Sequence, residues 1–216
     1  LIRLIVYVRS HFGLTLRVEK TVRVSAQQDA LQRGLNMVGR AVATRSTLPQ
    51  TSHVYLGTDD GRLRLAATNL EIAITCWVNA TIEEEGAITI PARLLTEFVA
   101  SLPNSEISIS VASRSRQALI TCTRNEATIS GMDADDFPPI PTIGDGETIL
   151  LEPTALRDAI DHVVFAAATD DSRPVLTGVN LRLNEGKLTF AAADGFRLAV
   201  FDLEIAKTPN ETIEII

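Results

Sequence analysis

The sequence predicts an α+β fold in which a β-α-β-β-β module recurs and its helices cover one face of antiparallel sheets. The first observation is that short alternating runs, typical of strands, are interrupted by a few amphipathic stretches with helical spacing. The second is an internal repeat. Shifted by 125 residues, the sequence matches itself without a gap, so that Ala30 falls on Ala155, Gly61 on Gly186 and Leu63 falls on Leu188. The chain is therefore expected to contain one unit and the start of a second.

The first module opens with an alternating strand at Thr21–Ser25 and continues into an amphipathic helix from about Gln27 to Ala43. Three strands are expected to follow, and Asp59-Asp60-Gly61 is a turn sequence between β-rich runs. The apolar face of the helix consists of Ala30, Leu31, Leu35, Val38 and Val42.

The same module then recurs. Gly86 precedes a strand at Ala87–Ile90, and Pro91 opens a helix that runs through Ala100. A proline-rich, acidic link at Asp133–Thr142 marks a domain boundary. The strands expected between this helix and the link are Glu106–Ser110, Gln117–Thr123 and Ala127–Ser130.

The second unit begins near Glu147, with a strand at Thr148–Leu151 and a helix that starts at Pro153. Its hairpin at Leu188–Val200 turns at Asp194-Gly195, a dipeptide common in tight two-residue turns. This division predicts domains at residues 22–144 and 145–216. Residues 1–21 form an extension with several cations and only one acid, interpreted as upstream sequence or as an amphipathic transit peptide.

The net charge of −7 and a pI near 5.0 argue against a DNA-binding protein that relies on a broad basic patch. Cys76 and Cys122 lack metal-ligand spacing, which favours a reduced, cytoplasmic protein with structural thiols. Asp133, Asp135 and Asp136 are either solvated acids of the link or a metal cluster, and the missing partner motif favours the former. We expect no catalytic residue, cofactor, metal or membrane partner.

Five short motifs then appear in order, and together they resemble the bacterial DNA sliding clamp, the beta subunit of DNA polymerase III. They are Arg45–Pro49, Ile90–Arg93, Asp136–Pro138, Arg173–Gly178 and Ala192–Ala199. The resemblance implies a non-enzymatic DNA-clamp fold, with three domains per protomer and two protomers closed head to tail into a ring around duplex DNA. On this basis the chain holds the first domain and half of the second, and the third is absent. The 216-residue chain would then not be retained on circular DNA.

The resemblance also implies which residues face DNA. Helices line the hole of such a ring, so Arg33, Arg40 and Arg93 would form a weakly attractive, non-specific lining. Arg45 matches a loop residue that contacts DNA in the family, whereas Asp170 departs from the polar residue of the equivalent loop. An ordinary solvated helix face remains the alternative for the three helix arginines, and helix capping for Arg45.

A peptide pocket is implied at the second hairpin, where apolar anchors and a few polar groups would capture a short segment of a partner. The implied partners are the DNA polymerase III catalytic subunit, the clamp loader and other proteins with a clamp-binding motif. Packed strand residues are the alternative interpretation. The pocket residues are Arg173, Leu176, Ala193, Gly195, Phe196, Arg197 and Leu198, of which Ala193 and Phe196 depart from the residues of some members.

The resemblance places a homodimer interface on the outer strand of the first domain, through Ala127 and Ile129, against the third domain of the partner. A second function stays open: a stand-alone, non-enzymatic peptide-binding or scaffold module derived from a clamp. The sequence downstream of Ile216 would separate the two.

Overall fold

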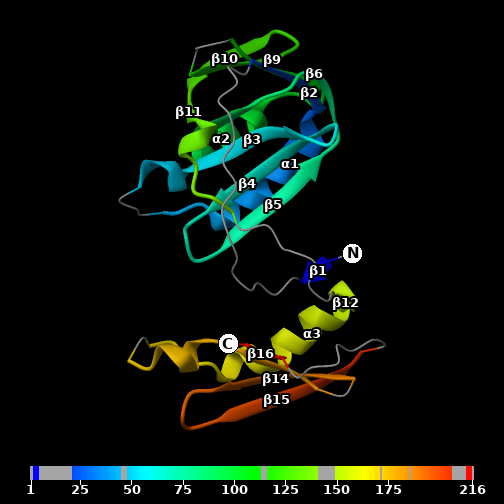
Figure 1. The fold of residues 1–216 in the computed structure, drawn as a ribbon, viewed down its shortest axis with the longest axis vertical. Helices are drawn as coiled ribbons and strands as arrows, with labels where there is room; N and C mark the ends of the chain where they lie inside the picture. The colour runs from blue at the N-terminus through cyan, green and yellow to red at the C-terminus, as the bar shows by residue number, and fades with distance from the viewer. Residues whose placement is uncertain are drawn as a thin grey trace. The chain divides into compact units, whose positions relative to one another are not determined.

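A computed structural model describes residues 2–4, 21–44, 48–112, 116–140, 149–170, 172–184, 186–205 and 213–215. The chain divides into two compact units (Figure 1). The amino-terminal unit comprises residues 12–140, and the carboxy-terminal unit comprises residues 141–216 together with residues 1–11. Both are antiparallel α+β structures, which confirms the predicted fold class.

The amino-terminal unit contains two five-stranded sheets, with strand orders β10-β9-β8-β2-β6 and β11-β7-β3-β4-β5. Strands of the first sheet are β2 (Val22–Gln27), β6 (Ala80–Glu84), β8 (Glu106–Val111), β9 (Gln117–Cys122) and β10 (Asn125–Ser130). Strands of the second are β3 (His53–Asp59), β4 (Arg62–Thr68), β5 (Ala73–Val78), β7 (Ala87–Pro91) and β11 (Met132–Asp133).

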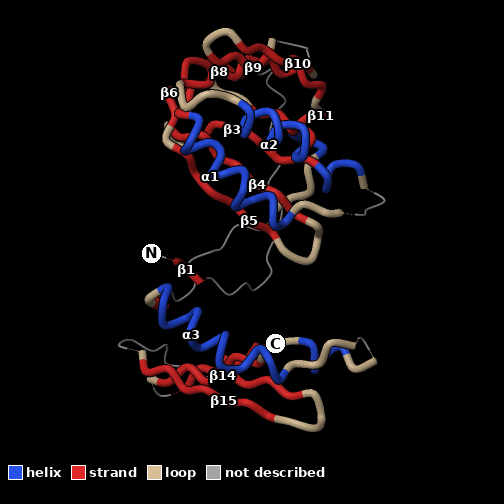
Figure 2. The backbone as a smooth tube through the Cα atoms, turned by 180° about the vertical axis from the view of Figure 1, so that it is seen from behind, coloured by secondary structure: helices blue, strands red, loops and turns tan. Residues whose placement is uncertain are grey.

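Two helices pack on one side of these sheets, α1 (Gln28–Val38) and α2 (Ala92–Ser101), as Figure 2 shows from behind. The centres of their apolar stripes are buried, with Leu35 of α1 and Leu95 of α2 both at 0% exposure. The predicted helical periodicity is therefore confirmed. The first helix ends sooner than predicted, because the chain tightens into a 3₁₀ turn at Gly39–Ala41.

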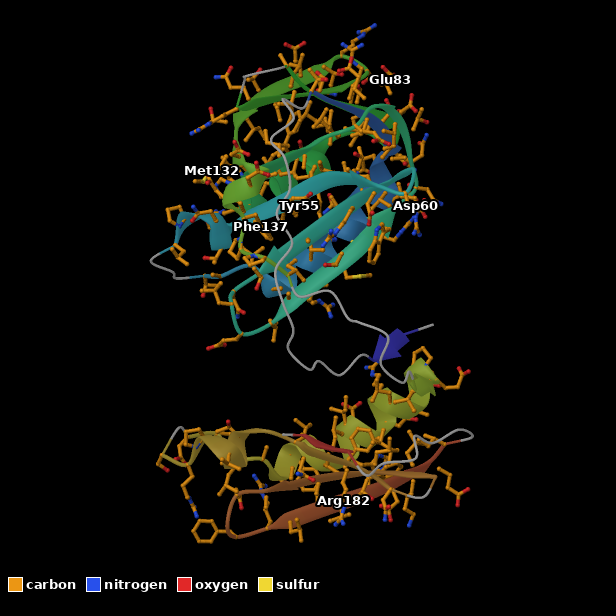
Figure 3. The ribbon with its side chains drawn as sticks, viewed as in Figure 1. Tyr55, Asp60, Glu83, Met132, Phe137 and Arg182 are labelled. Atoms are coloured by element: carbon orange, nitrogen blue, oxygen red, sulfur yellow. The ribbon has the colours of Figure 1, made fainter. Side chains whose placement is uncertain are left out.

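Two parts of this unit differ from the sequence-based expectation. Strand β6 was not predicted, because its sequence ends in acids and Glu is depleted in strands; it nevertheless pairs with β2. The start of the expected link is also part of the fold. Met132 and Asp133 pair with β7, and the ring of Phe137 lies 5.6 Å from that of Tyr55 on β3 (Figure 3). The later part, residues 141–148, lies outside the described residues.

The carboxy-terminal unit is a single sheet of order β15-β14-β13-β16, against which the helix α3 (Pro153–Val163) packs. A separate strand, β12 (Ile149–Leu151), pairs with β1 (Ile2–Leu4), a pairing that the sequence did not predict. The core centres on Phe190, which is fully buried. The strands of the sheet are β13 (Asn180–Asn184), β14 (Lys187–Ala193), β15 (Leu198–Glu204) and β16 (Ile213–Ile215).

The repeat is reproduced in the strand register. In the amino-terminal unit Leu65 of β4 pairs with Leu56 of β3 and with Cys76 of β5. The residue 125 positions later, Phe190, pairs with Leu181 and Phe201, which lie at the same offset from the other two. The hairpins of the two units are therefore built on the same pairing, as the repeat predicted.

His53 belongs to a buried polar network beneath β11. Its Nδ1 lies 3.3 Å from the hydroxyl of Thr89, which donates a hydrogen bond of 3.2 Å to the carbonyl oxygen of Met132. Burial lowers the pKa of His53 below its usual value, against a smaller opposing contribution from a hydrogen bond to the backbone of Thr89. The neutral imidazole is therefore the form that the folded unit favours.

This network predicts a loss of stability at mildly acidic pH. The unfolded chain takes up a proton on His53 near pH 6.5, whereas the folded chain does so only at lower pH. The contribution of His53 to the free energy of unfolding is therefore complete above about pH 6.5, and it is lost as the pH falls below about 6.5 towards the pKa of the folded state. We expect the urea midpoint of the amino-terminal unit to fall between pH 7.5 and 5.5, and His53→Gln to reduce that fall. His162→Gln, at an exposed histidine of α3, is the matched control and should leave the fall unchanged. An equal fall in His53→Gln would contradict the assignment to His53.

Candidate functional site

The tip of the second hairpin is held by Asp194. Its Oδ1 accepts hydrogen bonds from the backbone N–H groups of Phe196 and Arg197, at 2.9 and 3.0 Å. Gly195 has a φ of +93°, a conformation that glycine adopts without the steric cost other residues meet. The turn lies where the sequence predicted it, but it is longer than a two-residue Asp-Gly turn, because Ala193 pairs with Leu198 and residues 194–197 lie between them.

Two arginines fold back onto this turn. Arg197 donates from Nε to Oδ2 of Asp194 at 2.9 Å, and its guanidinium lies 5.8 Å from the centroid of the Phe165 ring. Arg173 donates from Nη2 to the carbonyl oxygen of Asp194 at 3.3 Å. The backbone donors of Phe196 and Arg197, followed by the Arg197 side chain, lower the pKa of Asp194. Arg197, which the sequence sets between two large apolar residues, is thus held by its own turn.

The elements around this turn expose several large apolar side chains, called here the hairpin cluster. Phe196 is 97% exposed and Leu198 is 69% exposed, although large apolar side chains are normally covered. Leu198 pairs with Ala193 on β14, so small residues lie beside it on the outer face of the sheet. Such a cluster on a folded unit is typical of an interaction surface. Its large members are Val164, Phe165, Val175, Phe196, Leu198 and Val200.

Most of the predicted pocket residues come together here. Arg173 contacts the turn directly, and Ala193, Gly195, Phe196, Arg197 and Leu198 belong to the hairpin itself. Leu176 lies in the 3₁₀ turn at Pro174–Thr177, which packs against β14, and its side chain is half-buried.

The sequence analysis missed Phe165, Val175 and Val200. A signal for Val200 was available, because residues two apart on a strand share a face with Leu198. No local sequence pattern identifies Phe165, because its contact with the site forms only in the folded unit. Its ring meets Arg197 because the short 3₁₀ turn at Val164–Ala166 lies against β14 and β15.

Two of the arginines predicted to face DNA, Arg33 and Arg93, are exposed but form ion pairs within their own helices. Arg33 forms an ion pair with Asp29 at 2.8 Å, and Arg93 forms one with Glu97 at the same distance. Such exposed pairs contribute little to stability, yet they reduce the positive field of the helix face. Arg40 is exposed on the turn after α1 and makes no ion pair with another described residue. Arg45 lies outside the described residues.

The outer strand of the amino-terminal unit, β10, pairs with β9 on one side and is the edge of its sheet. The predicted interface residues differ in exposure: Ala127 is half-buried, while Ile129 is 9% exposed and belongs to the core of the unit. Ile129 would therefore reach a neighbouring chain through its backbone, as in the addition of a strand to a sheet edge.

The acids of the link have a local explanation. Asp133 accepts a hydrogen bond at 3.1 Å from the backbone N–H of Asp135 and so caps a short 3₁₀ turn. Within the described ranges, no three His, Cys, Asp or Glu side chains are grouped so that they could hold a metal ion. No helix among those residues has both the length and the apolar character needed to cross a membrane.

Two family models match the chain in sequence order. The model described as DNA polymerase III beta subunit, N-terminal domain, matches residues 22–141, and the one described as the central domain of the same subunit matches residues 150–216. Among curated relatives, the beta sliding clamp of Synechocystis sp. is 37% identical over 188 residues, which cover 84% of this chain and 48% of that protein. The beta sliding clamp of Synechococcus elongatus is 35% identical over 191 residues, covering 87% and 51%.

Solved structures show the same similarity. The DNA polymerase sliding clamp from Bacillus subtilis matches with a TM-score of 0.85 at 26% identity, over 90% of this chain and 53% of that one. The sliding clamp from Pseudomonas aeruginosa, solved bound to griselimycin, matches with a TM-score of 0.82 at 33% identity, over 90% and 53%. The chain spans about half the length of the curated relatives it matches.

Proposed function

Because the chain belongs to the DNA polymerase III beta subunit family, we propose that the protein is a sliding clamp, a processivity factor that encircles duplex DNA as a dimeric ring. In this role it tethers the polymerase III catalytic subunit, the clamp loader and other proteins that carry a clamp-binding peptide. The observation that carries the proposal is the match of two consecutive clamp domains, in order, across residues 22–141 and 150–216.

The charges on the helices support a topological grip on DNA. A ring does not need tight binding to stay on DNA, and strong contacts to phosphates would slow its sliding. Arg33 and Arg93 are exposed, yet each is paired with an acid one helical turn away, which leaves a weakly attractive surface. Arg40, without such a pair among the described residues, is the strongest candidate for a phosphate contact.

The hairpin cluster supports peptide capture. Phe196, Leu198 and Val175 offer exposed apolar surface, which is what a peptide with apolar anchors requires. Arg173 and Arg197 lie beside this surface, held on the turn by Asp194. They are placed to donate hydrogen bonds to the carboxylates or backbone carbonyls of a bound segment.

Replacing Arg33, Arg40 and Arg93 together with Gln should weaken equilibrium DNA binding by the full-length protein without preventing its retention on circular DNA. Each lost phosphate contact lowers the slope of log K against log salt by about 1, so the slope should fall by up to about 3. Retention depends on ring closure, so the variant should stay on nicked circular DNA through gel filtration once the clamp loader has acted.

Arg62→Gln is the matched control. Arg62 is an exposed cation on β4, and its neighbour Leu63 points into the core beneath the helices. Because successive side chains on a strand point to opposite faces, Arg62 points away from the helices. It should leave the salt slope unchanged; an equal change in both variants would show that the helix faces are not the DNA side. Linearising the DNA should release the protein. Equal retention on linear and circular DNA would overturn the topological clamp, whereas loss of retention on circular DNA would favour the stand-alone peptide-binding module.

A further inference from the structure

The turn that presents the pocket residues has a counterpart in the amino-terminal unit, between β4 and β5. Asn69 there holds the same position as Asp194: its Oδ1 accepts from the backbone N–H groups of Glu71 and Ile72, at 3.0 and 2.9 Å. The bond that closes the turn, from the N–H of Asn69 to the carbonyl oxygen of Ile72, is 3.3 Å long, as is its equivalent between Asp194 and Arg197. The two hairpin tips are the same backbone structure.

The segments beside the two tips also correspond. The 3₁₀ turn at Pro49–Ser52 matches the one at Pro174–Thr177, 125 residues later. In each unit the N–H of the third residue of this turn bonds to the carbonyl oxygen three positions back, at 3.2 Å to Leu48 and at 2.9 Å to Arg173. The backbone at Leu48 therefore matches the backbone at Arg173, whose side chain bonds to the second tip.

The side chains on this shared scaffold differ as a set. In the second unit a Cβ on Gly195 would lie 3.1 Å from Nη2 of Arg173, so glycine leaves room for the guanidinium. In the first unit both positions are leucine, Leu70 and Leu48, and both are exposed, at 58% and 44%. Arg197 is likewise replaced by an exposed Ile72. The polar pair has become an apolar one while the backbone is unchanged.

Leu70 carries a backbone strain that its own packing does not explain. Its φ is +79°, in the left-handed region that costs free energy for any residue with a Cβ, and glycine holds the equivalent position in the second unit. A buried leucine could recover that cost through apolar contacts, but Leu70 is mostly exposed. Strain held at an exposed apolar residue is a feature of binding sites.

We propose that Leu48, Leu70 and Ile72 form a second peptide-docking surface, on the amino-terminal unit, and that it takes a short uncharged peptide with apolar anchors. The class of ligand rests on the proposed function of the carboxy-terminal hairpin, whose backbone this surface repeats. The selectivity follows from the local charges. At the second tip the guanidinium groups of Arg173 and Arg197 can bind a carboxylate, whereas the equivalent positions of the first tip are Leu48 and Ile72, and the exposed Glu71 beside Ile72 repels one. An acidic peptide is therefore favoured only at the second tip.

NMR titration of the ¹⁵N-labelled full chain with two synthetic peptides tests this. The probes are acetyl-Ala-Leu-Ala-Ile-Phe-amide, which is neutral, and acetyl-Asp-Leu-Ala-Ile-Phe-amide. We expect the neutral peptide to shift the amide signals of Glu71 and Ile72, and Leu70→Gly to weaken that binding at least about tenfold. Glycine prefers a positive φ, so this variant should fold at least as stably, as its melting temperature would show. Leu48→Arg with Ile72→Arg should turn the first tip towards the acidic peptide.

The outcomes separate this surface from the proposed pocket. Shifts confined to Phe196 and Arg197, or neutral-peptide binding unchanged in Leu70→Gly, would overturn the second surface and leave the pocket standing. Shifts confined to the first tip with both peptides would support the second surface and count against the pocket. Signals unmoved at both tips would overturn the second surface outright.

Discussion

Leu198→Asp should abolish binding of a clamp-binding peptide by the full-length protein. Leu198 is 69% exposed, so its side chain contributes little to the core and is available to a ligand. Buried apolar anchors at the centre of an interface typically contribute 2 kcal/mol or more, so we expect an affinity loss of at least about 30-fold. A carboxylate at this position also has to be desolvated against the apolar side chains of the ligand. Fluorescence polarisation with a labelled peptide from the polymerase catalytic subunit measures the loss.

Two controls make this result specific. Glu204→Gln changes an exposed charge at the far end of the same strand, and it should leave the peptide affinity unaltered. Dimerisation, followed by analytical ultracentrifugation, should be the same for Leu198→Asp and the parent, because the predicted interface lies on β10. A peptide affinity that barely changes in Leu198→Asp would show that Leu198 does not belong to the pocket.

The repeat made most of the fold predictable. Pairing registers on β3–β4–β5 and β13–β14–β15 agree because the apolar alternation and the turn residues recur together, and these are the features that set register. Strand β6 escaped prediction because its pairing with β2 depends on a change of sheet after Val78, which no local pattern records. Tertiary pairing there outweighs the poor strand propensity of glutamate.

The candidate site was less predictable, because its key contacts join residues far apart in sequence. The sequence places Arg197 between two apolar residues, but its contact with Phe165, and that of Arg173 with Asp194, appear only in the fold. The sequence analysis also placed a peptide site only at the second hairpin. The matching backbone shows that both tips are built alike and that only their side chains differ.

Phe190→Ala should unfold the carboxy-terminal unit while the amino-terminal unit stays folded. Phe190 is fully buried among the few core residues of this unit, and removing a buried phenylalanine costs about 3–5 kcal/mol. A small core leaves little reserve against such a loss. Trp77 on β5 is the only tryptophan, so its fluorescence reports the amino-terminal unit alone, whereas far-ultraviolet circular dichroism reports both. We expect the urea transition of Trp77 to be unchanged in Phe190→Ala and the dichroism to lose the contribution of the second unit.

Leu65→Ala provides the matched comparison, because residue 65 is the counterpart of residue 190 in the repeat and is equally buried. A cavity at this site should cost about 2–5 kcal/mol and shift the Trp77 transition to lower urea, with the carboxy-terminal unit unaffected. The reciprocal pattern follows from the two separate clusters of buried residues, one in each unit. If Phe190→Ala moved the Trp77 transition as far as Leu65→Ala does, the two units would unfold as one cooperative block, and the candidate peptide site could not be lost without the helices proposed to face DNA.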